Sequence, residues 1–184
     1  QYPKVHSHHT AKLALSLFDQ TTSIHGMGEV EREWLEYASL LHDIGHHIQE
    51  NQHHKHTYYL MTHADLPGFS ADEIGILANV ARYHRRGLPK VGHQGFKLLN
   101  AEQRKTVLGL SAILRIADGL DRSHFSVVKA IKVDVGKSLR LQIVFRYDPE
   151  LELWTTERRK KLFEKIFHCQ VELHPSGVTT KDAA

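Results

Sequence analysis

The adjacent residues His42 and Asp43 are the pair in this sequence best suited to chemistry. They close an apolar helical run, and Gly45, two residues later, lets another chain or a ligand come close. Imidazole and carboxylate together are ligands of first-row transition metals rather than of calcium. Neighbouring residues on a helix point about 100° apart, so both can reach one ion only where the helix ends or meets a crevice. The pair therefore predicts a metal site only if other parts of the chain supply further ligands.

Other metal-type ligands lie on or beside apolar helical stripes elsewhere in the chain. His9 stands four residues before Leu13, and Asp118 lies four residues after Leu114 on a predicted helix. A buried carboxylate without a partner is costly, and a cation shared by these groups would supply that partner. The candidate metal ligands are His9, His42, Asp43, His56, His84 and Asp118.

Each candidate also has a more ordinary interpretation. A single histidine on an apolar face is more often a hydrogen-bonded core residue, and Asp118 with Arg122 four residues later could form a helix-surface ion pair. It is the joint occurrence of the ligands, in this order and on helices, that favours a metal site. Most other histidines, His53 among them, are assigned no functional role. The marginal candidates are His6, His46 and His124.

The number of candidate ligands favours two ions. Four histidines and two aspartates exceed what one tetrahedral ion needs, so two ions that share a carboxylate and a water are the economical arrangement. Two metals about 3.5–4 Å apart lower the pKa of that water and clamp both oxygens of a displacement at phosphorus. Nitrogen and oxygen ligands fit divalent Mn, Fe, Co, Ni or Zn, with Mg as an alternative. The basic residues expected to neutralise phosphate oxygens are Lys55, Arg85, Arg86 and Arg122.

The composition sets the broad class of protein. The 184 residues, 41% hydrophobic and 24% charged, suffice for one or two globular domains, and 16 histidines suit metal binding or acid–base chemistry. The formal net charge of +3 is too small to indicate nucleic acid by itself. The single Cys169 fits a reducing, cytoplasmic setting, and no apolar run approaches the ~18 residues that a bilayer requires. Because the chain begins with Gln1 and not Met, we expect a fragment or a processed product.

The periodicity predicts a mainly α fold. Helices are expected over residues 7–20, 29–43, 57–64, 70–81, 100–122 and 149–167, the fourth opened by a capping box at Ser70 and Glu73 and the fifth capped by Asn100. Alternating residues predict a hairpin over 131–135 and 139–143, and a further strand over 170–173. We therefore expect a helical bundle over residues 1–125, a small ββαβ subdomain over 126–175 and a flexible tail over 176–184.

The order of His9, His42-Asp43 and Asp118 resembles the HD superfamily of metal-dependent phosphohydrolases. More narrowly, residues 5–125 resemble the C-terminal region of the exopolyphosphatase/guanosine pentaphosphate phosphohydrolase (Ppx/GppA) family. The phrases that carry this resemblance are His9-Thr-Ala-Lys-Leu13, Leu41-His42-Asp43-Ile44-Gly45, His56-Thr57-Tyr58-Tyr59-Leu60, Ala81-Arg82-Tyr83-His84-Arg85, and Leu114-Arg115-Ile116-Ala117-Asp118-Gly119-Leu120-Asp121-Arg122.

The resemblance implies a helical HD domain followed by a small mixed domain. It also implies that the family's exopolyphosphatase chemistry resides in an N-terminal portion with an actin-like ATPase fold, whose glycine-rich turns are absent from this sequence. Some family members have lost HD ligands, but this chain keeps them all at matching positions. His46 after Gly45 departs from the cyclic-dinucleotide phosphodiesterase branch, whose Gly-Tyr-Pro signature is also missing. Cyclic dinucleotides are therefore not the expected substrates.

Two functional hypotheses follow. In the first, the chain is a metal-dependent phosphohydrolase domain acting on polyphosphate or phosphorylated nucleotides such as guanosine tetra- and pentaphosphate. Asp43 and His84 have catalytic roles, His9, His42, Asp43 and Asp118 hold one ion, and His56 and His84 help to hold a second. In the second, the chain is a polyphosphate-binding and dimerisation module with a structural or vestigial metal site. A homodimer is expected, and a membrane is not. Nucleic acid ranks last, because the basic residues are not interleaved with aromatic ones.

Overall fold

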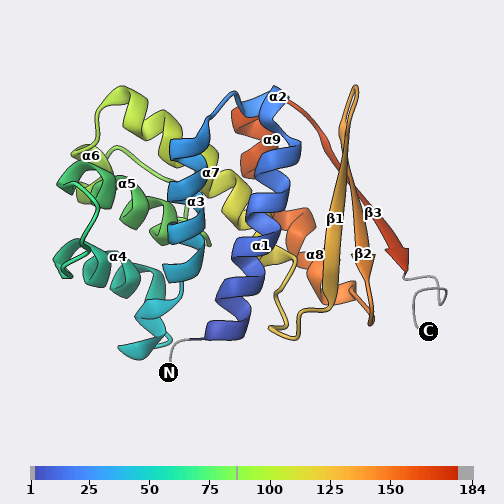
Figure 1. The fold of residues 1–184 in the computed structure, drawn as a ribbon, viewed down its shortest axis with the longest axis horizontal. Coiled ribbons are helices and arrows are strands. Elements are labelled where there is room, and N and C mark those ends of the chain that lie inside the picture. Colours follow the sequence, from blue (N-terminus) through green and yellow to red (C-terminus); the bar gives the residue numbers. More distant parts are fainter. Residues whose placement is uncertain (1–2, 86, 178–184) are drawn as a thin grey trace.

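The computed structural model describes residues 3–85 and 87–177, and its helices form one body with a small sheet at one side (Figure 1). This arrangement confirms the mainly α fold class. The elements are, in order, α1 (Lys4–Gln20), α2 (Thr22–His25), α3 (Glu29–Leu41), the 3₁₀ helix η1 (Ile44–His47), α4 (His53–His63), α5 (Ala71–Arg82), α6 (Gln94–Lys97), α7 (Ala101–Gly119), β1 (Val128–Val135), β2 (Leu139–Phe145), α8 (Glu150–Arg159), α9 (Lys161–Phe167) and β3 (Val171–Gly177).

Helix α7 is the central element of the fold. Its residues from Gly109 to Gly119 are all buried, and α1, α3, α5, α8 and α9 all pack against it. The predicted stripe of Val107, Leu110, Leu114 and Ala117 therefore forms part of the core, although burial extends around the whole helix. A helix covered on every side is hydrophobic beyond a single stripe, because no face remains for solvent.

The two predicted helix starts with polar caps are confirmed. The Ser70 hydroxyl accepts a hydrogen bond from the Glu73 backbone N–H, and the Glu73 carboxylate accepts one from the Ser70 N–H. Asn100 and Gln103 form the same reciprocal pair at the start of α7. Each pair satisfies N–H groups that a helix N-terminus leaves without internal partners.

Several predicted boundaries are wrong by a few residues. Helix α1 begins at Lys4, α3 ends at Leu41 and α7 ends at Gly119. The polar run before residue 57 predicts a loop, but α4 begins at His53, directly after Gln52, whose backbone is in the left-handed conformation (φ 59°). The helix expected over 149–167 is two helices that meet at Lys160. Polar composition marks exposure rather than the absence of a helix, and tertiary packing sets where helices end.

The sheet has the strand order β1-β2-β3. The predicted hairpin is confirmed as antiparallel β1 and β2, whereas β3 runs parallel to β2, as a strand that returns after helices can. Strand β3 continues to Gly177 and so passes the expected start of the tail at 176; residues 178–184 lie outside the described residues. The inner residues Ile131, Leu141 and Ile143 belong to the same hydrophobic core as the helices.

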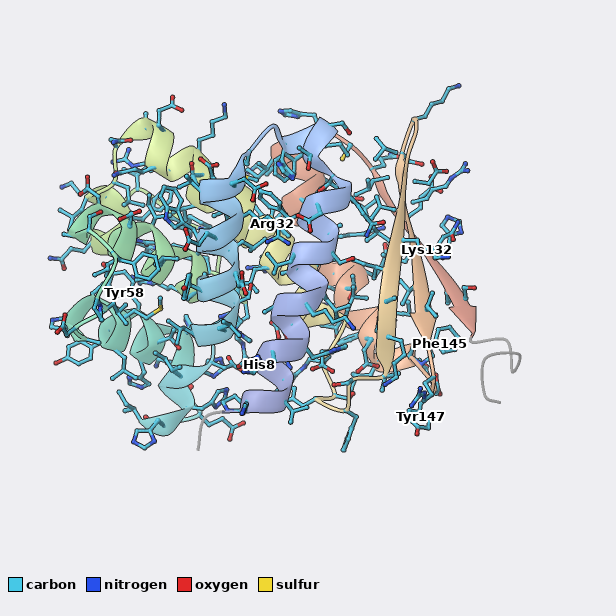
Figure 2. The ribbon with its side chains drawn as sticks, viewed as in Figure 1. His8, Arg32, Tyr58, Lys132, Phe145 and Tyr147 are labelled. Carbon is cyan, nitrogen blue, oxygen red and sulfur yellow. The ribbon has the colours of Figure 1, made fainter. Side chains whose placement is uncertain are left out.

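Two further contacts join elements of the fold. Asp19 of α1 and Arg32 of α3 form a two-bond ion pair on the surface, where Figure 2 shows Arg32 between the two helices. At Gly119, a Cβ atom would lie 3.2 Å from the Thr156 Cα atom, so α7 and α8 approach closely beside the end of α7.

In the part of the chain that the structure describes, no helix is both long and apolar enough to cross a membrane.

Candidate metal centre

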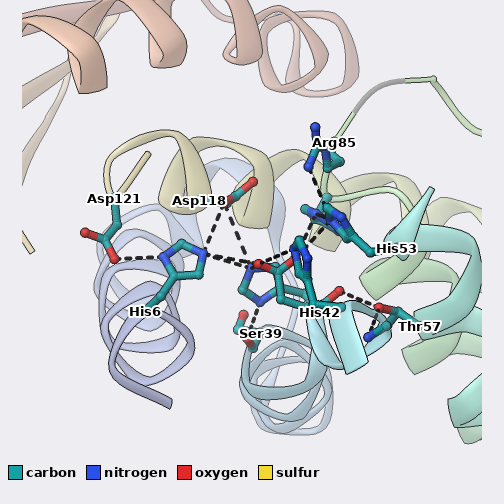
Figure 3. Close-up of polar contacts among 12 residues, drawn as sticks. His6, Ser39, His42, His53, Thr57, Arg85, Asp118 and Asp121 are labelled. Atoms are coloured by element: carbon teal, nitrogen blue, oxygen red, sulfur yellow. Dashed lines mark hydrogen bonds and ion pairs between the residues drawn. The ribbon is translucent and has the colours of Figure 1, made fainter. Parts of the chain in front are cut away.

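A group of buried histidines and aspartates lies where several helix ends meet (Figure 3). The first turn of α1 faces the ends of α3, α5 and α7, together with the start of α4. These elements contribute one or two side chains each, so the group depends on the tertiary fold. Its members are His6 on α1, His42 and Asp43 after α3, His53 at the start of α4, His84 after α5, and Asp118 near the end of α7.

The four imidazole rings are oriented in the same way. Each Nδ1 atom lies against a carbonyl or carboxylate oxygen, which can only accept a hydrogen bond, so Nδ1 carries the hydrogen. In the neutral ring the lone pair is then on Nε2, and the four Nε2 atoms point into the centre. The Nδ1 partners are Asp121 Oδ2 at 2.8 Å for His6, Ser39 O at 2.6 Å for His42, Glu50 O at 3.0 Å for His53 and Ala81 O at 2.6 Å for His84.

The lone pairs face one another at distances that favour a shared cation. His6 Nε2 and His42 Nε2 are 3.2 Å apart, and His53 Nε2 and His84 Nε2 are 3.4 Å apart. Two unprotonated nitrogens at such a distance repel each other unless a proton or a metal ion lies near both. Histidines that ligate metals characteristically donate their other N–H to a backbone carbonyl or a carboxylate, as these rings do.

Asp43 connects the two histidine pairs. Its Oδ2 atom lies 3.7 Å from His6 Nε2 and 3.6 Å from His42 Nε2, while its Oδ1 atom lies 3.2 Å from His53 Nε2 and 3.4 Å from His84 Nε2. One carboxylate therefore presents a separate oxygen to each pair. A carboxylate placed in this way can offer one oxygen to a cation beside each pair.

Asp118 completes the group from α7. Its Oδ1 atom lies 3.5 Å from His6 Nε2, and its Oδ2 atom accepts a hydrogen bond from Arg159 of α8. Burial by itself would raise the pKa of the Asp118 carboxyl, but the charge of Arg159 and the hydrogen bond with His6 hold that pKa well below its ordinary value. Asp118 is therefore ionised and available as a ligand.

Electrostatics keep Asp43 ionised and His84 neutral. Burial opposes the charge of Asp43, but the surrounding imidazoles of His42, His46, His53 and His84 outweigh it and lower the pKa of Asp43 far below its ordinary value. Burial, followed by the charge of His42, lowers the pKa of His84 well below 6.5. An ionised carboxylate and a neutral imidazole are the protonation states that metal ligation requires.

A cavity of about 140 Å³ opens over this group. Among the described residues, acidic and basic side chains line it together, and the basic ones come from three different segments of the chain. His124 also borders it, with its ring stacked on His6 at 3.7 Å between centroids. The lining residues are Asp43, His46, Glu50, His84, Arg85, Asp118, Arg122, His124 and Arg159.

The donor set fits divalent transition-metal ions. Among the described residues, four groups of three side chains have ligand atoms within 4.8 Å of one another, and Asp43 belongs to three of them. Buried imidazole nitrogens with two carboxylates suit these ions better than calcium, which takes oxygen ligands. The four groups are His6-Asp43-His124, His6-His42-Asp118, His42-Asp43-His84 and Asp43-His46-His53.

The structure brings four of the six expected ligands together. These are His42, Asp43, His84 and Asp118. His9 and His56 belong to none of the four groups, although each lies within three residues of a histidine that does. His9 lies on the α1 face toward β1, where Val128 is its backbone partner, and His56 is half-buried on α4.

The expected phosphate-binding residues divide in the same way. Arg85 and Arg122 line the cavity, and Arg85 Nη1 lies 3.3 Å from His53 Nε2. Lys55 is exposed on α4 and is not among the residues that line the cavity. Arg86 lies outside the described residues.

Sequence reasoning missed several members of the centre, and the positions of the helix ends explain most of these omissions. A site at the ends of α3, α5 and α7 requires the first turn of α1, which carries His6, whereas His9 lies a turn further along. The same argument selects His53, the first residue of α4, over His56. Arg159 lies about 40 residues after Asp118, and no spacing pattern in the sequence connects the two. The residues not singled out as ligands or site residues were His6, His46, His53, His124, Asp121 and Arg159.

We expect His6 and not His9 to be required for metal binding. Replacing His6 by alanine removes one of the converging Nε2 atoms and should weaken metal affinity by at least about tenfold. Replacing His9 by alanine should leave the affinity within about twofold, and competition with a chromophoric chelator measures both. Equal losses in the two variants would contradict the ligand set that the structure brings together.

The stability of the metal-free protein should fall as the pH rises from about 6.5 to about 9. Burial alone would lower the pKa of His6, but hydrogen bonds with Asp118 and Asp121, together with the charges of Asp118 and Asp43, outweigh it and raise the pKa to about 9. Protonated His6 therefore favours the folded state; this stabilisation is complete below pH 6.5 and is lost as the pH passes 9. The change is on the order of 3 kcal/mol.

Urea unfolding in the presence of a chelator, repeated across this pH range, measures the effect. The His6→Gln variant is the control, and its stability should change much less over the same range. If the two proteins show the same pH dependence, another group is responsible.

Comparison with protein families assigns the class of this protein. Residues 3–161 match the family described as Ppx/GppA phosphatase, domain III. The chain belongs to this family, and the match includes α1 to α8 and therefore every residue of the centre. The expected resemblance to the C-terminal region of the family is thus confirmed.

Several curated relatives carry the name guanosine-5′-triphosphate,3′-diphosphate pyrophosphatase. The protein of Vibrio vulnificus is 33% identical over 108 residues, which cover 58% of this chain and 21% of the relative. The protein of Pseudoalteromonas atlantica is 30% identical over 108 residues, with the same two shares, 58% and 21%. That of Pseudoalteromonas translucida is 42% identical over 50 residues, or 27% of this chain and 10% of the relative. The aligned part thus spans about a fifth or less of each relative.

Proposed function

We propose that this chain is an HD-type metal-dependent phosphohydrolase domain. The observation that supports it best is the common orientation of four buried imidazoles, whose Nε2 atoms converge with the Asp43 and Asp118 carboxylates. Aligning these groups in the interior costs free energy unless a cation binds there. Membership of a phosphatase family is consistent with this proposal.

The ligands divide between two cation positions. His6, His42, Asp43 and Asp118 would hold one ion, while His53 and His84, with the other oxygen of Asp43, would hold a second, and His46 lies beside this position. Divalent ions bound there supply activation of water as a nucleophile and neutralisation of phosphate oxygens. Asp121 would fix the ring of His6 through its Nδ1 atom, and Ser39 O and Ala81 O would do the same for His42 and His84.

The cavity suits a phosphorylated substrate. Arg85 and Arg122 at its wall offer planar donor groups that match phosphate oxygens. Because the relatives are named for a guanosine nucleotide with phosphates on both ends, phosphorylated nucleotides such as guanosine pentaphosphate are the substrates we favour, with polyphosphate second. For a chain that is part of a longer protein, an N-terminal portion with an actin-like ATPase fold would be the partner of this domain.

Metal content tests the proposal directly. The protein is purified without added metal or chelator, and elemental analysis should find about one to two equivalents of a transition metal. The metal-loaded protein is then offered guanosine pentaphosphate and polyphosphate, and release of phosphate is measured. A folded protein that takes up none of Mn, Fe or Zn on titration would refute the proposal.

A second function remains from the second sequence hypothesis. The chain could bind polyphosphate and support dimerisation, with a metal that is structural only. The specific observation that favours it is the short extent of the match, which covers about a fifth of the length of each of these relatives. A protein that binds metal and polyphosphate but releases no phosphate would establish this function instead.

A further inference from the structure

A side chain from the C-terminal part of the chain reaches the proposed metal centre. Helix α8 packs on α7, and Gly119 permits this because a Cβ atom there would lie 2.8 Å from Thr156 Oγ1 and 3.2 Å from Thr156 Cα. The same point lies 3.3 Å from the Arg159 Cδ atom. The close approach of the two helices thus places Arg159, the last residue of α8, beside Asp118.

Arg159 occupies one of the two oxygens of the Asp118 carboxylate. Its Nη1 atom donates a hydrogen bond to Oδ2, which leaves Oδ1 facing His6 and His42. A carboxylate held in this way can bind a cation through one oxygen only. Partners of this kind fix the orientation of metal ligands.

The guanidinium group of Arg159 has further donors. It carries five N–H bonds in a planar fork, and among the described residues Asp118 is the side chain it is hydrogen-bonded to. Its side chain is 14% exposed and lines the cavity above the centre. Part of this side chain is therefore accessible from the cavity.

Among the described residues, guanidinium groups and carboxylates are equal in number around the cavity, Arg85, Arg122 and Arg159 with Asp43, Glu50 and Asp118. Arg115, one helical turn before Asp118, is buried and donates to the Tyr83 backbone oxygen. Burial, together with the charge of Arg159, lowers the pKa of Arg115 to about 10. Because the lining charges balance, divalent cations at the proposed positions would make the cavity positive and favour an additional anion there.

The geometry points to Arg159 as a phosphate-binding residue of this cavity: it orients Asp118 with one nitrogen and donates with the others to a phosphoryl group of the substrate. This inference rests on the proposed function and adds a residue that the helical domain alone does not contain. The substrate class is a compound with an accessible terminal phosphate, and inorganic phosphate and pyrophosphate are its simplest probes. The site is then composed of both parts of the chain, and α8 is needed for substrate binding.

Phosphate and pyrophosphate binding to the metal-loaded protein, measured by calorimetry, tests the inference. The variants are Arg159→Ala and Arg159→Lys, and metal content and far-UV circular dichroism are recorded for each. We expect the alanine variant to bind pyrophosphate ten- to a hundredfold more weakly with its metal retained, because phosphate loses a planar donor pair. The lysine variant keeps the charge but not the fork, so an intermediate loss is expected.

Arg158→Ala is the matched control. It removes the same charge from the adjacent residue, but Arg158 is exposed and stacks on Trp154 at 4.8 Å. Its pyrophosphate affinity should equal that of the unchanged protein. An equal loss in both variants would indicate a general charge effect and overturn the inference.

The remaining outcomes are also decisive. Unchanged pyrophosphate binding in a metal-loaded Arg159→Ala variant overturns the role of Arg159 and leaves the proposed function intact. If a folded Arg159→Ala variant loses its metal, the metal-loaded Arg159→Lys variant decides, because unchanged pyrophosphate affinity there overturns the inference. If that variant does not fold, Arg159→Lys decides, since unchanged affinity there overturns the inference. A wild-type protein that takes up no metal refutes the proposed function itself.

Discussion

Replacing Asp43 by alanine should abolish metal binding and phosphohydrolase activity while the chain remains folded. Asp43 is a member of three of the four ligand groups among the described residues, and its two oxygens face different histidine pairs. The variant therefore loses a ligand at both cation positions at once. Changing a partner outside the ligand shell costs about 10–100-fold in metal affinity or activity, so loss of a shared ligand should exceed about 100-fold.

Elemental analysis and phosphate release measure the two effects, and circular dichroism reports the fold. Asp19→Ala is the matched control, because Asp19 is an aspartate in a surface ion pair with Arg32, far from the centre. It should retain metal and activity. If Asp43→Ala unfolds while Asp19→Ala does not, the metal is structural, and the binding-module function gains support.

Replacing Gly45 by alanine should destabilise the protein by about 3 kcal/mol or more. An added Cβ atom would lie 2.1 Å from the His53 backbone oxygen and 2.5 Å from the Thr57 backbone nitrogen. Both atoms are main chain at the start of α4, so no side-chain rotation relieves the overlap. Helix α4 has to move, and with it His53 and the hydrogen bond from Gly45 N–H to Thr57 Oγ1.

Chemical denaturation of the metal-free protein gives the free energy of unfolding of this variant. Gly87→Ala is the control, since a Cβ atom there meets nothing within 4 Å, and its stability should change by less than about 0.5 kcal/mol. We also expect the Gly45→Ala variant to bind fewer metal equivalents, because His53 moves away from His84. A Gly45→Ala variant as stable as the Gly87→Ala variant would show that α4 does not press on this glycine.

Local sequence signals determined most of the helical framework. The caps at Ser70 and Asn100 act within four residues, so the side chains that form them are adjacent in any fold. Periodicity located α5, α7 and the hairpin for the same reason, since amphipathic spacing is a local property. The ends of helices were predicted less accurately, as the start of α4 shows. Whether a polar turn is helical depends on the residues that pack against it.

The candidate site was accessible to sequence reasoning only in part. His42, Asp43, His84 and Asp118 could be selected because each follows or ends an apolar stripe, and the structure brings them together. The choice between His6 and His9, or between His53 and His56, could not be made from spacing. Both members of each pair lie near the same face of their helix, one turn apart. Only the tertiary structure shows which of the two turns lies beside the ends of the other helices.

Arg159 shows what the tertiary structure alone decided. Its place beside Asp118 depends on the close approach of α7 and α8 at Gly119. It also depends on strands β1 and β2, which lie between these two helices in the sequence. No local rule relates residues so distant along the chain, because their contact results from packing of the whole core. The sequence by itself determined the chemical types of the ligands and the helices that carry them. The fold determined which turn of each helix reaches the centre, and which cations lie around it.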